Sequence, residues 1–188
     1  MSEHANVPYV VRLDRRYELL GVYSAGVTTW TLPVEDPAVD TIVLGDQFEA
    51  SGLWYPPDSN SGTSITLAGR FDYGLCVLGH AYDMNVELTR PFHRDQNGTP
   101  NLKAWLTLRA ATFAHHNTGY YEVLSQMTSR ADRSRVFSFA YQPGEEFGTL
   151  TANFNGRCDD NRLFVLNNTP RPSVISAIDY HCDFVLRV

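Results

Sequence analysis

The stretch that decides the fold reads Glu87-Leu-Thr-Arg-Pro-Phe-His-Arg-Asp-Gln-Asn-Gly-Thr-Pro100, then Asn101-Leu-Lys-Ala-Trp-Leu-Thr-Leu-Arg109, then Ala110-Ala-Thr-Phe-Ala-His-His-Asn-Thr-Gly-Tyr-Tyr-Glu-Val123. It predicts an extended segment, a turn-rich loop around Gly98 and Pro100, and then an alternating strand. Side chains of a strand alternate between two faces, so one face collects the apolar residues Leu102, Ala104, Leu106 and Leu108. We expect Leu106 and Leu108 to face inward on a central strand.

A polar turn is expected at residues 117–119, with a second strand running back from it. Gly119 suits a turn position that needs a positive φ. Tyr121 and Val123 begin the returning strand on a common face. The two strands and their turn predict an antiparallel pair.

The same period of two runs through the rest of the chain. Turn signals at spacings of about ten residues separate the expected strands, which favours a sandwich or barrel. These strands are 9–13, 27–32, 41–44, 64–67, 74–78, 101–112, 120–127, 136–141, 148–153, 163–167 and 174–188. No segment offers a capped amphipathic helix of useful length. The sequence predicts an all-β fold, an antiparallel β-sandwich or Greek-key barrel with long loops and little helix.

Length and composition indicate an ordinary folded protein. The 188 residues fit a single β-rich domain spanning 1–188, with 1–20 as a candidate N-terminal arm. The net charge of −6 argues against a general nucleic-acid-binding surface. The N-terminus lacks the apolar core of a signal peptide and no apolar run approaches a membrane span, so we expect synthesis in a cytoplasm and no membrane insertion.

Three cysteines lie far apart in the sequence without C-x-x-C spacing. This pattern signals neither a disulfide framework nor a zinc site. Cys76 and Cys182 sit in apolar strand patterns, and we expect both in the core.

Two clusters could carry chemistry. Asp179, His181 and Asp183 share the odd face of the last expected strand, close enough for two of them to ligate a metal or work as an acid–base pair. The favoured interpretation is a solvated outer face with His181 paired to a carboxylate. His115 and His116 are adjacent and point to opposite faces of a strand, and a surface turn explains them better.

Other catalytic motifs are missing from the sequence. No serine lies in a G-x-S-x-G motif and no glycine-rich loop matches a phosphate cradle. The run Asp159-Asp160-Asn161 lacks a calcium-loop pattern and predicts a hairpin turn. We therefore expect a protein that is not an enzyme, with no catalytic residue, no metal and no cofactor.

An interaction surface is a better candidate than an active site. Trp54-Tyr55 lies in a loop before two prolines, and exposed aromatics of this kind are enriched at interfaces. A competing interpretation is a platform for stacking sugar rings. Arg130, Arg133 and Arg135 form a basic cluster, either a solvated loop or a contact for an acidic neighbour or passing DNA. The candidate interaction residues are Trp54, Tyr55, Phe92, Arg94, Arg130, Arg133 and Arg135. A further aromatic face is expected at Phe137, Phe139 and Tyr141.

The chain resembles the tail nozzle proteins (tail tubular protein B) of T7-like podophages. The resemblance rests on Pro91-Phe92-His93-Arg94, on the strand with Leu106, Leu108 and Arg109, and on Asn117-Thr118-Gly119-Tyr120-Tyr121-Glu122-Val123. Weaker similarities are Leu13-Asp14-Arg15, Thr31-Leu32-Pro33 and Tyr73-Gly74-Leu75-Cys76-Val77-Leu78-Gly79. Known nozzle proteins are several times longer, so this chain would correspond to a module or fragment.

The resemblance implies a structural role in the virion. The chain would be assembled in the host cytoplasm into a homo-oligomeric ring on the tail axis. Its partners would be other tail proteins, such as the adaptor and the tail fibres, with DNA only as passing cargo. An acidic conduit is compatible with this role, because it repels phosphate and does not trap the duplex. A carbohydrate-binding β-sandwich for host-surface attachment is the alternative, and a small hydrolase built on residues 179–183 is the third hypothesis.

Overall fold

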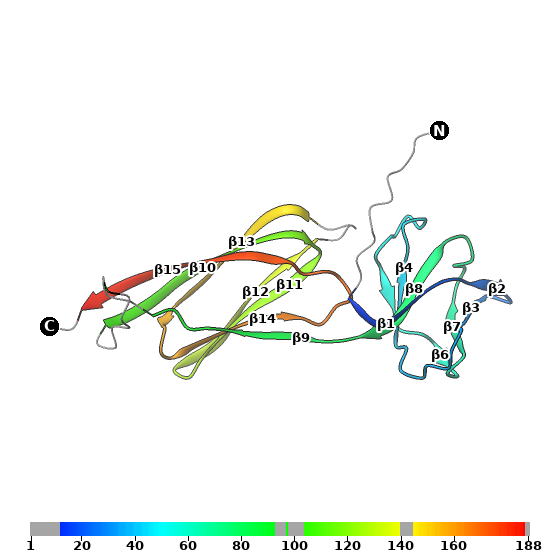
Figure 1. Cartoon of the computed structure of the whole chain (residues 1–188), viewed down its shortest axis with the longest axis horizontal. Coiled ribbons are helices and arrows are strands. Elements are labelled where there is room, and N and C mark those ends of the chain that lie inside the picture. Colours follow the sequence, from blue (N-terminus) through cyan, green and yellow to red (C-terminus); the bar gives the residue numbers. More distant parts are fainter. Residues whose placement is uncertain (1–11, 93–96, 98–103, 140–144, 187–188) are drawn as a thin grey trace, which may run out of the picture. The chain divides into compact units, whose positions relative to one another are not determined.

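The computed structural model describes residues 12–92, 97, 104–139 and 145–186 (Figure 1). Within these residues the chain forms fifteen strands and no helix, and all the sheets are antiparallel. The predicted all-β fold class is therefore confirmed. Where the sequence suggested one domain, the contacts gather in two compact units. Unit 1 comprises Met1–Asp83, Phe139–Glu145 and Asn168–Pro172, and unit 2 comprises Met84–Ser138, Glu146–Asn167 and Ser173–Val188.

Unit 1 contains two four-stranded sheets. The first has the order β1 (Leu13–Leu20), β8 (Leu75–Ala81), β4 (Thr41–Leu44) and β5 (Trp54–Tyr55). The second has the order β2 (Val22–Ser24), β3 (Val27–Thr31), β7 (Ser64–Ala68) and β6 (Ser59–Asn60). Of the candidate arm, residues 1–11 lie outside the described residues, while Leu13–Leu20 forms an edge strand of the first sheet.

The core of unit 1 is shared by its two sheets. Trp30 and Ile65 come from the second sheet, whereas Ile42, Cys76 and Leu78 come from the first. All five side chains are completely buried, and they occupy alternate positions of their strands as the period of two requires. Burial of this apolar area is the main favourable contribution to folding.

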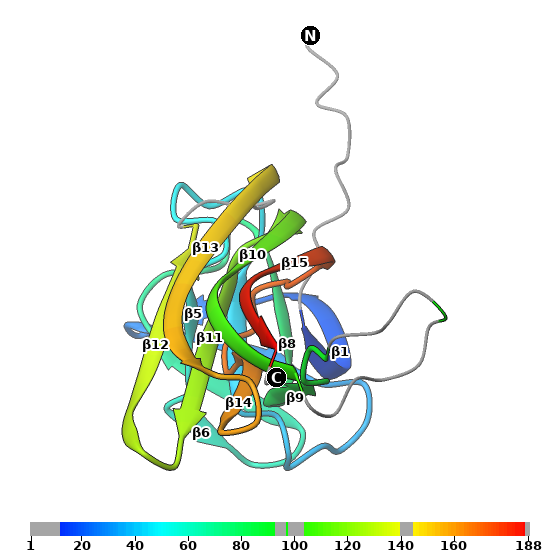
Figure 2. The ribbon, with the colours of Figure 1, turned by 90° about the vertical axis from the view of Figure 1, so that its left-hand side faces the viewer.

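Unit 2 is a seven-stranded sandwich. Its four-stranded sheet has the order β12 (Arg130–Ser138), β11 (Tyr120–Met127), β14 (Asn161–Asn167) and β9 (Met84–Leu88). Its three-stranded sheet has the order β13 (Glu145–Arg157), β10 (Ala104–Thr118) and β15 (Ile175–Leu186). Figure 2 shows the three strands of the second sheet curving side by side.

Strand β10 lies in the centre of its sheet and confirms the inward face predicted from alternation. Leu108 is buried in the core of unit 2, and the half-buried Leu106 packs against that core. A register irregularity between Leu108 and Ala110 then shifts the buried face to odd positions, so that Phe113 is buried. Leu102 lies outside the described residues.

Two expectations for the region around the β10–β11 turn are wrong. The left-handed backbone conformation falls on Asn117 (φ 46°) and not on Gly119. Asparagine tolerates this conformation better than most residues with a side chain. His115 lies on β10 and is buried, not in a surface turn. Its Nδ1 is 3.0 Å from the Tyr121 hydroxyl, and its ring contacts Phe137 with centroids 4.2 Å apart. His116 is the next residue on the same strand and is half-buried. The two histidines therefore point to opposite faces, as predicted.

The aromatic face expected at Phe137, Phe139 and Tyr141 does not form as one exposed surface. Phe137 packs against the core of unit 2 beside Tyr121. Phe139 follows the end of β12 and is exposed, and Tyr141 lies outside the described residues. Phe137 faces inward because its register partner on β11, Tyr121, is a buried residue.

Candidate functional site

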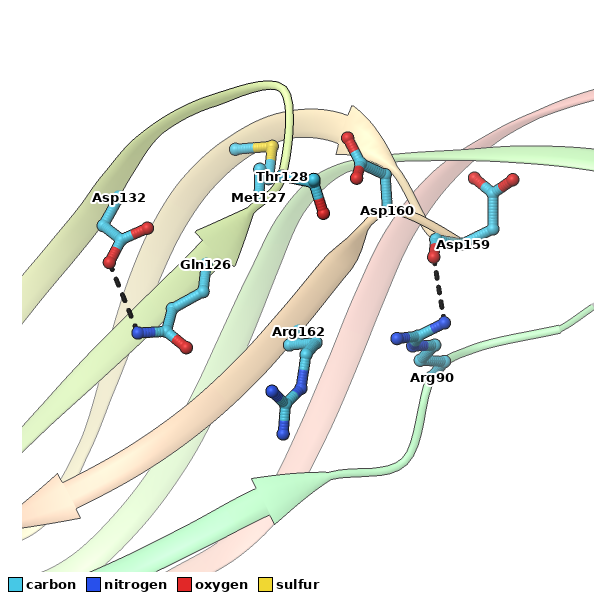
Figure 3. Close-up of a pocket in the computed structure, with 8 residues that line it drawn as sticks. All are labelled: Arg90, Gln126, Met127, Thr128, Asp132, Asp159, Asp160 and Arg162. Carbon is cyan, nitrogen blue, oxygen red and sulfur yellow. Dashed lines mark hydrogen bonds between the residues drawn. The ribbon is translucent and has the colours of Figure 1, made fainter.

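A pocket of about 300 Å³ opens at one end of unit 2 (Figure 3). Several separate segments reach it: the end of β11, the start of β12, the β13–β14 turn, the start of β14, and the chain just after β9. Its lining residues are Arg90, Gln126, Met127, Thr128, Asp132, Asp159, Asp160 and Arg162. The pocket therefore combines two guanidinium groups with three carboxylates.

Each arginine of the pocket is positioned by one partner. Arg162 donates from Nε and Nη2 to the two carboxylate oxygens of Glu87, at 2.8 and 2.7 Å, and lies over the Phe164 ring at 5.0 Å. This hydrogen bond holds the pKa of Glu87 below its ordinary value. Arg90 donates from Nη1 to the backbone carbonyl of Asp159 at 2.9 Å (Figure 3).

Two of the carboxylates of the pocket accept hydrogen bonds from neighbouring side chains. Asp160 accepts a hydrogen bond from the Ser129 hydroxyl at 2.6 Å, and the hydroxyls of Ser129 and Thr128 lower its pKa. Asp132 accepts from the Gln126 side-chain amide at 3.3 Å. Asp159 lies in the turn between β13 and β14, as predicted, and pairs with Arg157.

The predicted row on β15 is an exposed outer face. His181 Nε2 lies 3.9 Å from Asp179 and 3.3 Å from the Thr112 hydroxyl, while Asp183 accepts from Arg109 at 2.5 Å. The favoured interpretation of His181 beside a carboxylate is confirmed. Among the described residues, no group of three or more His, Cys, Asp or Glu side chains could hold a metal ion.

The aromatic candidates fall at different places in the two units. Trp54 and Tyr55 form the short strand β5 and not a loop. Trp54 is 41% exposed, whereas Tyr55 packs against the core of unit 1, with its ring 6.0 Å from Phe71. Phe92 is exposed in unit 2, and Arg94 lies outside the described residues.

The three candidate arginines lie on edge strand β12, not in a loop. Arg133 pairs in register with Ser125, and Arg135 pairs with Val123. Ser125 and Val123 are buried, so the two arginine side chains start from the side of β12 that faces the other sheet. Arg133 donates to the Phe154 carbonyl at 3.1 Å, and Arg130 donates to the Asn155 carbonyl at 3.0 Å. Both carbonyls belong to β13, the edge strand of the other sheet. The arginines thus link the two edges on one side of the sandwich, which also protects them from pairing with other chains.

Replacing Arg133 by glutamine should lower the free energy of unfolding of unit 2 by about 1 kcal/mol, because the hydrogen bond to the Phe154 carbonyl is lost. Urea denaturation measures the change. Arg135 is the matched control, since it lies on the same strand and is exposed. Equal effects of Arg133→Gln and Arg135→Gln would contradict the linking role.

The thiols behave as core residues. Cys76 is completely buried in unit 1, and the half-buried Cys182 packs against the core of unit 2, as predicted for both. Burial raises the pKa of Cys76 and of Cys158 to about 12, so both are protonated at neutral pH. The structure also brings Cys158 and Cys182 within hydrogen-bonding reach, which their spacing in the sequence did not indicate.

No protein-family model matches the chain, and no curated protein matches it. Within the described residues there is no helix long and apolar enough to cross a membrane. The pocket residues Gln126, Asp132 and Arg162 were missed by sequence reasoning. Each occupies an ordinary polar position of its strand, and no local signal marks it.

Proposed function

We propose that this chain is a structural component of a short-tailed bacteriophage tail, similar to a module of the nozzle. In this role it forms part of a ring-shaped conduit for DNA ejection and a platform for neighbouring tail proteins. It is assembled in the host cytoplasm and works in the virion without catalysing a reaction.

The observation that carries the proposal is the position of the most family-like sequence element, residues 118–123. Thr118 is buried at the β10–β11 turn, where its hydroxyl accepts from the Val174 amide at 3.0 Å and donates to the His116 carbonyl at 2.9 Å. Tyr121 and Val123 are completely buried in the core of unit 2. The element therefore joins two strands and anchors the segment leading into β15, which supports an architectural role.

An apolar face on unit 1 offers a surface for subunit contacts. Ile42 and Leu44 point into the core, so Val43 faces the other side of the first sheet, next to Val77 on β8 and Trp54 on β5. Val43 and Val77 are buried, and Trp54 is the exposed member of these three. Leu20 and Leu75 pair on β1 and β8 and are both exposed. Large contiguous apolar patches on a protein surface mark contact sites. In a cyclic ring, contacts between unlike faces of neighbouring subunits would bury such residues.

The experiment that tests the proposal is cryo-electron microscopy of purified phage particles that contain this chain. We expect several copies arranged as a ring around the tail axis, with adaptor and fibre proteins in contact. Quantitative mass spectrometry of the same particles gives an independent copy number. A single copy per particle, or density away from the tail axis, would remove the nozzle assignment.

A carbohydrate-binding role is the second candidate function, because Trp54 leaves part of its ring exposed on unit 1. Tyr55 does not share this surface, since it packs into the core, so the two rings do not form one platform. Glycan binding that is lost in Trp54→Ala and kept in Phe92→Ala would favour this function over the tail role.

A further inference from the structure

The pocket of unit 2 contains hydrogen-bond donors for which no described residue provides an acceptor. Arg162 spends Nε and Nη2 on Glu87, and within the described residues its Nη1 forms no hydrogen bond. Arg90 donates from Nη1 to the Asp159 carbonyl. Its Nε and Nη2 form no hydrogen bond to a described residue. In Figure 3 both arginine side chains lie below Asp159 and Asp160. Because each guanidinium is held by a partner, its remaining donors are oriented before any ligand arrives.

Acceptors lie beside these donors. Gln126 donates from its amide nitrogen to one oxygen of Asp132, so the amide oxygen of Gln126 and the second oxygen of Asp132 remain as acceptors. Gln126 projects into the space between Asp132 and Arg162 in Figure 3. Register explains this neighbourhood, because Gln126 on β11 pairs directly with Arg162 on β14.

The mixed lining restricts the class of ligand. A small anion would be attracted by two arginines but repelled by three aspartates. A small cation would be attracted by the aspartates but repelled by the arginines. A neutral sugar would leave the free arginine donors without a charged acceptor. A ligand that carries both a carboxylate and several hydroxyl groups matches all of these groups, because a hydroxyl both donates and accepts a hydrogen bond.

We propose that this pocket binds a sugar residue carrying a carboxylate group. The carboxylate lies against Arg90 and Arg162, and the ring hydroxyls contact Gln126 and Asp132. The volume of about 300 Å³ is at the lower end of the range for small-ligand sites and suits a single sugar ring. The site belongs to unit 2, whereas the exposed Trp54 belongs to unit 1, and the site does not depend on assembly into a tail.

Nuclear magnetic resonance titration of the full chain with D-glucuronate tests the proposal. We expect shifts at the Gln126 side-chain amide and the Arg162 Nε, with a dissociation constant on the order of 1 mM, as suits one exposed sugar ring. D-glucose and acetate serve as probes for the hydroxyls alone and the carboxylate alone, and each should bind at least about tenfold more weakly. Absence of shifts with glucuronate, or equal binding of acetate, would overturn the proposal.

Substitution of Arg90 locates the site. Arg90→Gln should weaken glucuronate binding by about tenfold or more, because a charge-assisted hydrogen bond is removed. Arg162 is a poorer choice, since it also pairs with Glu87 on edge strand β9. Arg157→Gln is the matched control, because Arg157 at the end of β13 contacts Asp159 and does not line the pocket. An unchanged thermal unfolding midpoint shows that Arg90→Gln is folded, and unaltered affinity in that variant would disprove the assignment.

Discussion

Replacing Phe113 by alanine should lower the free energy of unfolding of unit 2 by about 3–5 kcal/mol. Phe113 is completely buried in the middle of β10, and its ring lies 6.2 Å from that of Tyr121 on the facing sheet. Its removal leaves a cavity between two sheets whose backbones are held by hydrogen bonds and cannot collapse freely. Urea denaturation measures the change in free energy. Amide hydrogen exchange at Val123 and Val165 assigns that change to unit 2.

Phe147 provides the matched control in the same unit. It is 77% exposed on β13, so Phe147→Ala should change the free energy of unfolding by less than about 0.5 kcal/mol. If both alanine variants gave the same unfolding midpoint, Phe113 would not occupy the core.

Replacing Gly45 by alanine should destabilise unit 1 by about 2–3 kcal/mol. Gly45 follows β4, and its amide donates to the Leu75 carbonyl at 3.0 Å. A Cβ at this position would overlap that same carbonyl oxygen. The clash involves backbone in a sheet, so it is relieved only by displacing β8 or losing the hydrogen bond. The thermal unfolding midpoint of unit 1, followed at the buried Trp30, reports the change.

The contrasting position is Gly26 in the β2–β3 hairpin. It has a φ of 88°, and an added Cβ would meet no atom within 4 Å. Gly26→Asn should therefore cost less than about 1 kcal/mol, because asparagine tolerates the left-handed region. A Gly45→Ala protein as stable as Gly26→Asn would show that β4 and β8 do not approach as described.

Periodicity alone located most of the strands that supply the two cores, but the strand predicted at 9–13 meets β1 only at Leu13. The predicted limits 41–44 and 120–127 coincide with β4 and β11, because both are bounded by clear turn residues. Burial alternates along β11, whereas β4 is a short run that is buried throughout. The strands β2, β5, β6 and β9 were not predicted. They are short, and they form because a neighbouring strand supplies hydrogen-bond partners, which is tertiary information. The sequence predicts a loop at the Arg130 end of β12, because the charged residues there show no apolar alternation.

The candidate site could not be predicted in the same way. Its arginines and carboxylates are ordinary polar residues in the sequence, and Arg90 and Arg162 are separated by about seventy positions. His115 shows the opposite error, because a polar residue next to a turn was expected on the surface. The structure buries it beside Tyr121 and Phe137, where its ring packs like an aromatic residue and its nitrogen has a partner.

The sequence by itself determined the all-β class, the positions of the longer core strands, and which face of β11, of β15 and of β10 as far as Leu108 turns inward. These properties depend on side-chain alternation within a few residues, which the chain carries locally. Only the tertiary structure decided that two cores form, that β12 and β13 are linked by arginines, and that five separate segments meet at the pocket. Such arrangements depend on which strands pair across long stretches of chain, and local alternation favours many pairings equally.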